Sequence, residues 1–138
     1  AEKVNKIICI DLDNNALQNA KNRLFDNYKN VDYICDDVFA SCRKQYRETN
    51  LIINTSCEHM KPMKEWGPAP TYKNPWWDKV YPAYFAFQSN ALFDIPTHTN
   101  CFNYIEEFKK QLPDRAEVLI EDEIPYERGT RFTLIGHI

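Results

Sequence analysis

A short apolar run that ends on an acidic residue is the feature that most constrains the fold of this chain. Residues 6–11 read Lys-Ile-Ile-Cys-Ile-Asp, and an unbroken apolar run of this length is typical of a strand buried on both faces of a parallel sheet. A helical pattern follows at once, with Asn14 or Asn15 as the candidate N-cap. Strand, acid and helix in this order predict an α/β domain with its polar site at the carboxyl end of the strand.

The remaining elements continue this alternation and then change it. Further strands are predicted at residues 31–35, 50–54, 83–88, 117–121 and 131–136, and further helices at 38–46 and 103–112. The first half predicts a mostly parallel sheet with helices on both faces. The last two strands predict an antiparallel pair linked by residues 122–129. We therefore expect a single α/β domain over residues 1–138, built as three layers around one sheet.

Composition limits the class of protein further. The net charge of −3 argues against a general nucleic-acid binder, which usually carries a basic face. The sequence has no apolar run of 18 residues, so we do not expect membrane insertion. The cysteines are odd in number and form no CxxC motif, which favours reduced, buried thiols in a cytoplasmic protein. They are Cys9, Cys35, Cys42, Cys57 and Cys101.

Acidic or polar residues follow each of the first three predicted strands. Asp11-Leu12 ends the first, Asp36-Asp37-Val38 ends the second, and residues 54–60 (Asn-Thr-Ser-Cys-Glu-His-Met) end the third. In these segments the sequence resembles the class I S-adenosylmethionine-dependent methyltransferases, whose Rossmann-like sheet has seven strands with the last inserted antiparallel. The resemblance implies S-adenosylmethionine as the cofactor and methyl transfer to an acceptor that the sequence does not identify.

The resemblance also implies roles for the cofactor-binding residues. Asp11 would bind the ribose hydroxyls, because one carboxylate can accept two hydroxyl hydrogen bonds. Asp37 would receive the adenine amino group, with Asp36 as the alternative one position earlier. The implied cofactor-binding set is Asp11, Leu12, Asp36, Asp37, Val38 and Asn54.

A second set of residues would face the methyl acceptor. Glu58 and His59 follow the third predicted strand, and either side chain could take a proton from an acceptor amine or hydroxyl. The implied substrate-binding residues are Trp66, Gln88 and Asn90. The loop at residues 61–77, rich in proline and tryptophan, either shapes this pocket or covers a small satellite core. We expect no metal site, because neither His98 nor His137 has a ligand-spaced partner in the sequence.

The sequence departs from the family at its start. Only five residues precede Lys6, and the three glycines are Gly67, Gly129 and Gly136. The family's first strand and the glycine-rich loop after it therefore have no counterpart. We expect an N-terminally truncated domain that lacks the first strand and whose activity depends on that missing piece. Such a domain could associate with itself through the gap in its sheet.

Two other functions fit parts of the sequence. Residues 8–13 (Ile-Cys-Ile-Asp-Leu-Asp) look like the first motif of haloacid-dehalogenase-type phosphatases, with Asp11 as nucleophile and Asp13 as general acid. That family places its acidic pair after its serine motif, whereas Asp36-Asp37 precedes Ser56 here. The third hypothesis is a non-catalytic binding module with a Rossmann-like fold.

Overall fold

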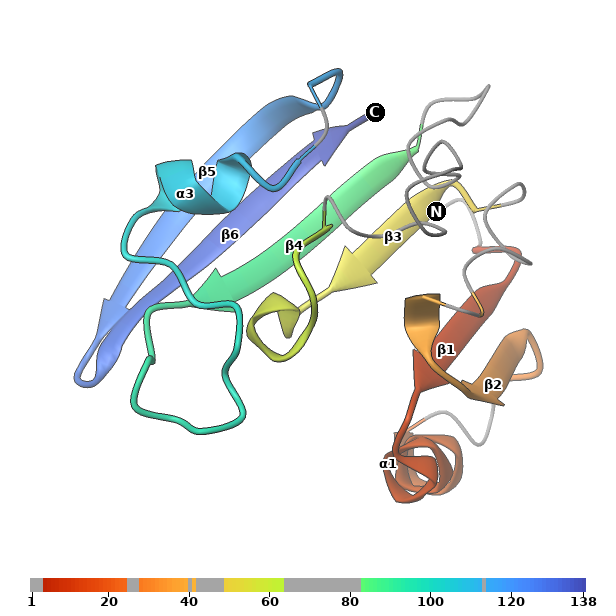
Figure 1. The fold of residues 1–138 in the computed structure, drawn as a ribbon. Helices are drawn as coiled ribbons and strands as arrows, with labels where there is room; N and C mark the ends of the chain where they lie inside the picture. The colour runs from red at the N-terminus through yellow and green to blue at the C-terminus, as the bar shows by residue number, and fades with distance from the viewer. Residues whose placement is uncertain (1–3, 25–27, 40, 42–48, 64–82, 113) are drawn as a thin grey trace, which may run out of the picture. The chain divides into compact units, whose positions relative to one another are not determined.

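A computed structural model describes residues 4–24, 28–39, 41, 49–63, 83–112 and 114–138 (Figure 1). The chain divides into two compact units, residues 1–45 and 46–138, and each is described by itself. The fold is mixed α/β, as predicted, and its described strands form two separate sheets. None of the described helices has the length and apolar composition needed to cross a membrane.

The first unit contains two parallel strands and one helical segment. Strand β1 (Ile7–Asp11) pairs with β2 (Val31–Cys35), so that Ile7 lies opposite Val31 and Asp11 opposite Cys35. Helix α1 (Asn14–Asn19) continues into a π-helical segment, η1 (Ala20–Leu24), and buries Leu17. The N-cap is Asp13, whose carboxylate accepts a hydrogen bond from the Asn15 amide at 2.8 Å. The expected cap at Asn14 or Asn15 was wrong by one or two residues, because Asp13 offers the charged acceptor.

The second unit contains a four-stranded mixed sheet in the order β3-β4-β6-β5. Strand β3 (Leu51–Asn54) is parallel to β4 (Tyr84–Asn90), whereas β6 (Gly129–His137) is antiparallel to both β4 and β5 (Glu117–Tyr126). The final strand pair is antiparallel, as predicted. The linker expected at 122–129 was wrong, because β5 continues to Tyr126, which pairs with Gly129. The edge position of β5 accommodates Pro125 within the strand.

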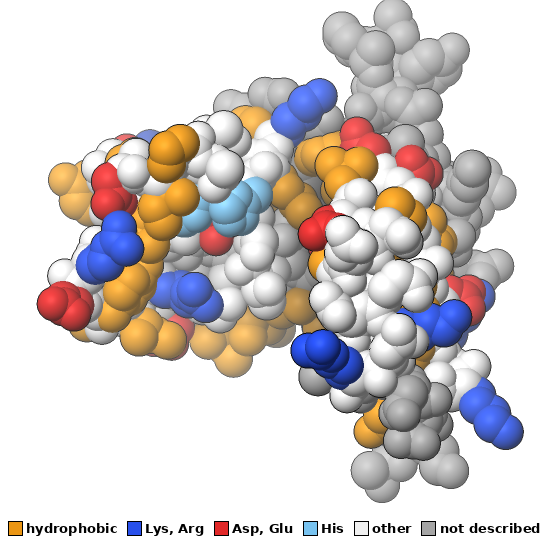
Figure 2. Space-filling model, turned by 90° about the horizontal axis from the view of Figure 1, so that it is seen from below, with side chains coloured by type: hydrophobic (Ala, Val, Ile, Leu, Met, Phe, Trp, Pro, Cys, Tyr) orange, Lys and Arg blue, Asp and Glu red, His pale blue; other side chains and the backbone are white. Residues whose placement is uncertain are grey.

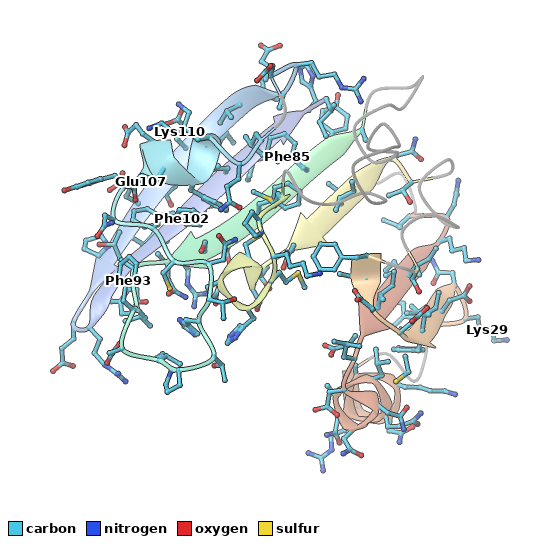
Figure 3. All side chains as sticks on the ribbon, in the orientation of Figure 1. Lys29, Phe85, Phe93, Phe102, Glu107 and Lys110 are labelled. Atoms are coloured by element: carbon cyan, nitrogen blue, oxygen red, sulfur yellow. The ribbon has the colours of Figure 1, made fainter. Side chains whose placement is uncertain are left out.

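The core of the second unit lies on one face of this sheet. Phe85 and Phe87 of β4 and Leu134 of β6 are fully buried there. Helix α3 (Ile105–Lys109) packs against β6 and buries Phe108, on which Phe102 stacks with ring centroids 5.0 Å apart (Figure 3). The helix is shorter than the predicted range 103–112.

The opposite face of the sheet carries exposed apolar side chains. Because strand residues alternate between faces, Tyr84 and Ile120 point away from the side that buries Phe85. The exposed apolar residues of the four strands include Leu51, Ile53, Tyr84, Ile120 and Ile124. Among the described residues, α3 packs on the core face. The fold agrees with the sequence prediction at the level of a mixed α/β architecture. The predicted three layers around one sheet are not seen, because the described strands form two sheets.

Of the two described glycines, Gly136 is predicted to be the less replaceable. An added Cβ would lie 2.7 Å from Phe85 Cζ and would clash with the Glu117 carbonyl oxygen. Gly136→Ala should therefore lower the free energy of unfolding by about 1–3 kcal/mol or more, because overpacking forces backbone shifts.

The matched control for this prediction is Gly129→Ala. Its added Cβ would meet the flexible end of Leu92, at 3.1 Å, and we expect a change within about 1 kcal/mol. Urea denaturation followed by circular dichroism measures both variants. Equal losses in the two variants would contradict the assigned packing of β6.

Candidate functional site

The carboxyl ends of β1 and β2 bring two predicted acids together in the first unit. The Asp36 amide donates to the Asp11 carbonyl at 3.1 Å, which places the end of β2 beside the end of β1. The exposed Asp11 carboxylate accepts a hydrogen bond from the Asp13 amide through Oδ1, at 2.8 Å. Asp11 is therefore oriented by the turn that follows β1 while it remains open to solvent. The adjacent Leu12 side chain is also exposed.

The next two acids differ in their availability to a ligand. Asp36 uses both oxygens locally, since Oδ1 accepts from the Asp37 amide at 2.8 Å and Oδ2 from the Ser41 hydroxyl at 2.6 Å. Asp37 is exposed and uses Oδ1 to accept from the Phe39 amide at 2.8 Å, at the start of the helical turn that contains the half-buried Val38. This difference favours Asp37 over Asp36 as the acid that contacts a ligand.

At the end of β3, Asn54 supports a short turn. Its Oδ1 accepts from the Ser56 amide at 3.0 Å, and its backbone carbonyl accepts from the Cys57 thiol at 3.7 Å. Asn54 is buried, so in this conformation it orients the 3-10 turn η3 (Cys57–His59). The predicted residues Glu58 and His59 project from that turn.

Glu58 and His59 meet a third side chain that the sequence did not indicate. The loop after β4 carries His98, and its ring lies edge-on to that of His59 with centroids 4.5 Å apart. The loop is fixed to η3, because the Glu58 carbonyl accepts from the amides of Thr99 and Asn100 at 2.8 and 3.0 Å. The sequence offered one weak signal for this contact, the polar irregular stretch that follows the fourth predicted strand.

Burial and a nearby negative charge raise the pKa values of the two thiols near this cluster, Cys57 and Cys101. Burial is the larger cause that raises the pKa of Cys57, and the nearby Glu58 carboxylate raises it further. The pKa of Cys101 is raised by the same two causes in the same order. Both residues therefore stay neutral thiols near pH 7 and are poor nucleophiles. Of the four described cysteines, all free, Cys57 is the buried one, whereas Cys35 is exposed, contrary to expectation.

The two predicted substrate-binding residues of β4 take different positions. Asn90 is buried at the strand end, where its Oδ1 accepts from the Leu92 amide at 3.0 Å and lies 3.2 Å from His98 Nδ1. Gln88 instead donates to the Thr133 hydroxyl across the sheet, at 3.1 Å. Asn90 therefore belongs to the histidine cluster, whereas the Gln88 amide serves the β4–β6 pairing. The third predicted residue, Trp66, lies outside the described residues.

A buried pair of amide side chains fixes the loop that carries His98. Gln111 Nε2 donates to Asn100 Oδ1 at 2.6 Å, and Gln111 Oε1 accepts from Asn100 Nδ2 at 3.1 Å. Gln111 Oε1 also accepts from the Met63 amide at 3.1 Å. Leu112 is half-buried, whereas Gln111 is buried at this turn, because its side chain satisfies polar groups of two other segments.

Gln111→Met is predicted to destabilise the second unit without a large change in side-chain volume. It removes three hydrogen bonds and leaves the Met63 amide and the Asn100 side chain without those partners. We expect a loss of about 2–4 kcal/mol in the free energy of unfolding, since each unsatisfied buried polar group costs about 1–3 kcal/mol.

Lys110→Met is the control for this variant, because Lys110 is the exposed neighbour of Gln111 (Figure 3). It should change the free energy of unfolding by less than about 0.5 kcal/mol. Both values come from urea denaturation. If Gln111→Met were as mild as Lys110→Met, the amide pair would not stabilise the loop.

Comparisons with protein-family models, curated proteins and solved structures found no match to this chain. The strand order and the side chains at the strand ends are therefore the features that indicate a function. A surface depression of the first unit is lined by residues that include Lys21, Tyr28 and Tyr33. It includes neither Asp11 nor Asp37, so it does not coincide with the predicted cofactor site.

Proposed function

We propose that this chain is a methyltransferase-type domain that uses S-adenosylmethionine. The observation that carries the proposal is the strand order of the two sheets. A doubly wound Rossmann sheet has the order 3-2-1-4-5-6. In the methyltransferase family a seventh strand is inserted antiparallel between the fifth and the sixth. The half of the sheet that begins with the fourth strand then has the order 4-5-7-6. The sheet β3-β4-β6-β5 has this order, with β6 antiparallel to both of its neighbours.

The parallel pair β1-β2 supports the same proposal from the first unit. In the family order, β1 corresponds to the second strand and β2 to the third, and these two strands are parallel neighbours. Asp11 then stands at the ribose position and Asp37 at the adenine position. In the sequence, the three glycines, at 67, 129 and 136, are all distant from β1. The contacts proposed for Asp11 and Asp37 are to the nucleoside half of the cofactor.

S-adenosylmethionine, held through its nucleoside by Asp11 and Asp37, would supply the methyl group. The acceptor would attack the methyl carbon in line with the sulfonium, and the carbon–sulfur bond would break as the new bond forms, which would leave the sulfur neutral. Glu58 or His59 would be the group that takes the acceptor proton. His59 Nδ1 lies 3.1 Å from the Thr97 carbonyl oxygen and must donate to it, so Nε2 carries the lone pair that accepts the proton.

The test is the binding of S-adenosylhomocysteine and of adenosine to the 138-residue protein. We expect the two ligands to bind with similar affinity, because both present the nucleoside. Asp11→Asn should weaken both by about 10- to 100-fold, the loss expected for hydrogen bonds to a charged group. Shifts of backbone amide resonances during NMR titration give the affinities.

Asp32→Asn is the matched control. Asp32 is an exposed acid of β2 that pairs with Lys6 at 2.7 Å, away from the carboxyl end of the strand. This variant should keep the wild-type affinity within about twofold, because exposed ion pairs contribute little. If millimolar adenosine failed to shift the amide resonances of residues 11–12 and 36–38, the proposed cofactor site would be wrong.

A further inference from the structure

Three metal-ligating side chains from distant parts of the sequence converge in the second unit. Glu58 and His59 lie in η3, His98 lies in the loop after β4, and one donor atom of each lies within 4.8 Å of the other two. Histidine side chains gather at one place on the surface (Figure 2). We propose that Glu58, His59 and His98 bind one divalent transition-metal cation of the zinc or ferrous type.

The hydrogen bonds of the two rings prepare both for metal binding. His59 Nδ1 faces the Thr97 carbonyl oxygen at 3.1 Å and must be the donor, which leaves the Nε2 lone pair free to bind a cation. His98 Nδ1 lies 3.2 Å from Asn90 Oδ1, an oxygen that already accepts from the Leu92 amide. That contact identifies Oδ1 as the acceptor, so His98 also donates from Nδ1 and presents Nε2. Metal-binding histidines usually have such an acceptor behind the ligating nitrogen.

The carboxylate supplies an independent reason to expect a cation. Glu58 is 6% exposed, and its Oε2 is buried with no hydrogen-bond partner among the described residues. Its Oε1 lies 3.9 Å from His59 Nε2. A buried carboxylate oxygen without a partner carries a large desolvation penalty. A bound cation would remove that penalty and would also use the two imidazole lone pairs.

The donor set and its exposure indicate the class of metal. Two imidazole nitrogens and one carboxylate suit zinc or ferrous iron, whereas magnesium and calcium prefer oxygen ligands. Bonds of about 2.1 Å place donor atoms about 3.4 Å apart in a tetrahedral site, so small side-chain rotations close the cluster. The His59 side chain is 43% exposed, which leaves room on its side for water or another ligand.

This inference does not depend on methyl transfer. A bound cation would occupy the His59 Nε2 lone pair and would take away its role as a proton acceptor. Metal binding and cofactor binding can be measured separately, because the first test needs no nucleoside and the second needs no metal. Failure of one test therefore leaves the other intact.

The test is a Co²⁺ titration of the metal-free 138-residue protein, followed by visible absorption. We expect saturable d–d bands at one cation per chain, with no near-ultraviolet thiolate charge-transfer band. Glu58→Gln and His98→Gln should each weaken binding by more than the roughly 10- to 100-fold that loss of an outer-shell partner costs. Excess Mg²⁺ should not displace the cobalt.

His137→Gln is the matched control, because it removes a histidine that pairs with Glu117, at 3.2 Å, outside the cluster. It should leave Co²⁺ affinity unchanged. Thermal unfolding separates metal binding from folding. Co²⁺ should raise the melting temperature of the wild type, and Glu58→Gln should abolish this shift without destabilising the metal-free protein.

Four results would overturn the proposal. The first three are no saturable d–d absorption in the wild type, equal weakening by His137→Gln, and unchanged affinity in Glu58→Gln. The fourth is a thiolate charge-transfer band, since it would move the site to a cysteine such as Cys101.

Discussion

The structure of the second unit depends on the two antiparallel ladders of β6. One ladder joins it to β4, from Tyr84 opposite His137 to Asn90 opposite Arg131, and the other joins it to β5. Because β6 lies inside the sheet, its Phe132 and Leu134 are buried beneath the segments that cover the core face. The positions of α3 and of the loop that carries His98 follow from this central strand.

The sequence predicted the features that depend on local periodicity. Alternating and continuous apolar runs located the strands, and the acids at their ends marked the polar edge of the first sheet. Two features were missed because they depend on neighbours far away in the chain. Residues 122–126 resemble a charged loop and are a strand, because β6 supplies their partners and the edge position tolerates Pro125. Gln111 is buried because Asn100 and the Met63 amide bind it.

The histidine cluster is a clearer case of a feature that depends on residues far apart in the chain. His59 and His98 are 39 residues apart and have no spacing that a motif could reveal. The Glu58 carbonyl binds two consecutive amides of the loop, and the Ser89 hydroxyl donates to the Asn100 carbonyl at 3.2 Å. These contacts hold His98 against His59. Our proposal of nucleoside binding comes from the strand order, whereas our proposal of cation binding comes from the cluster.

The short connection between β5 and β6 also has a consequence for how the second unit folds. Only residues 127–128 separate these strands, so their pairing closes a very small loop. The β4–β6 ladder brings together strands separated by residues 91–128. The entropic cost of closing this longer loop is higher than that of closing the β5–β6 loop. We therefore expect the hairpin to form early and to act as the template on which β4, and then β3, add. In such a sequence of events the two histidines meet among the last contacts made.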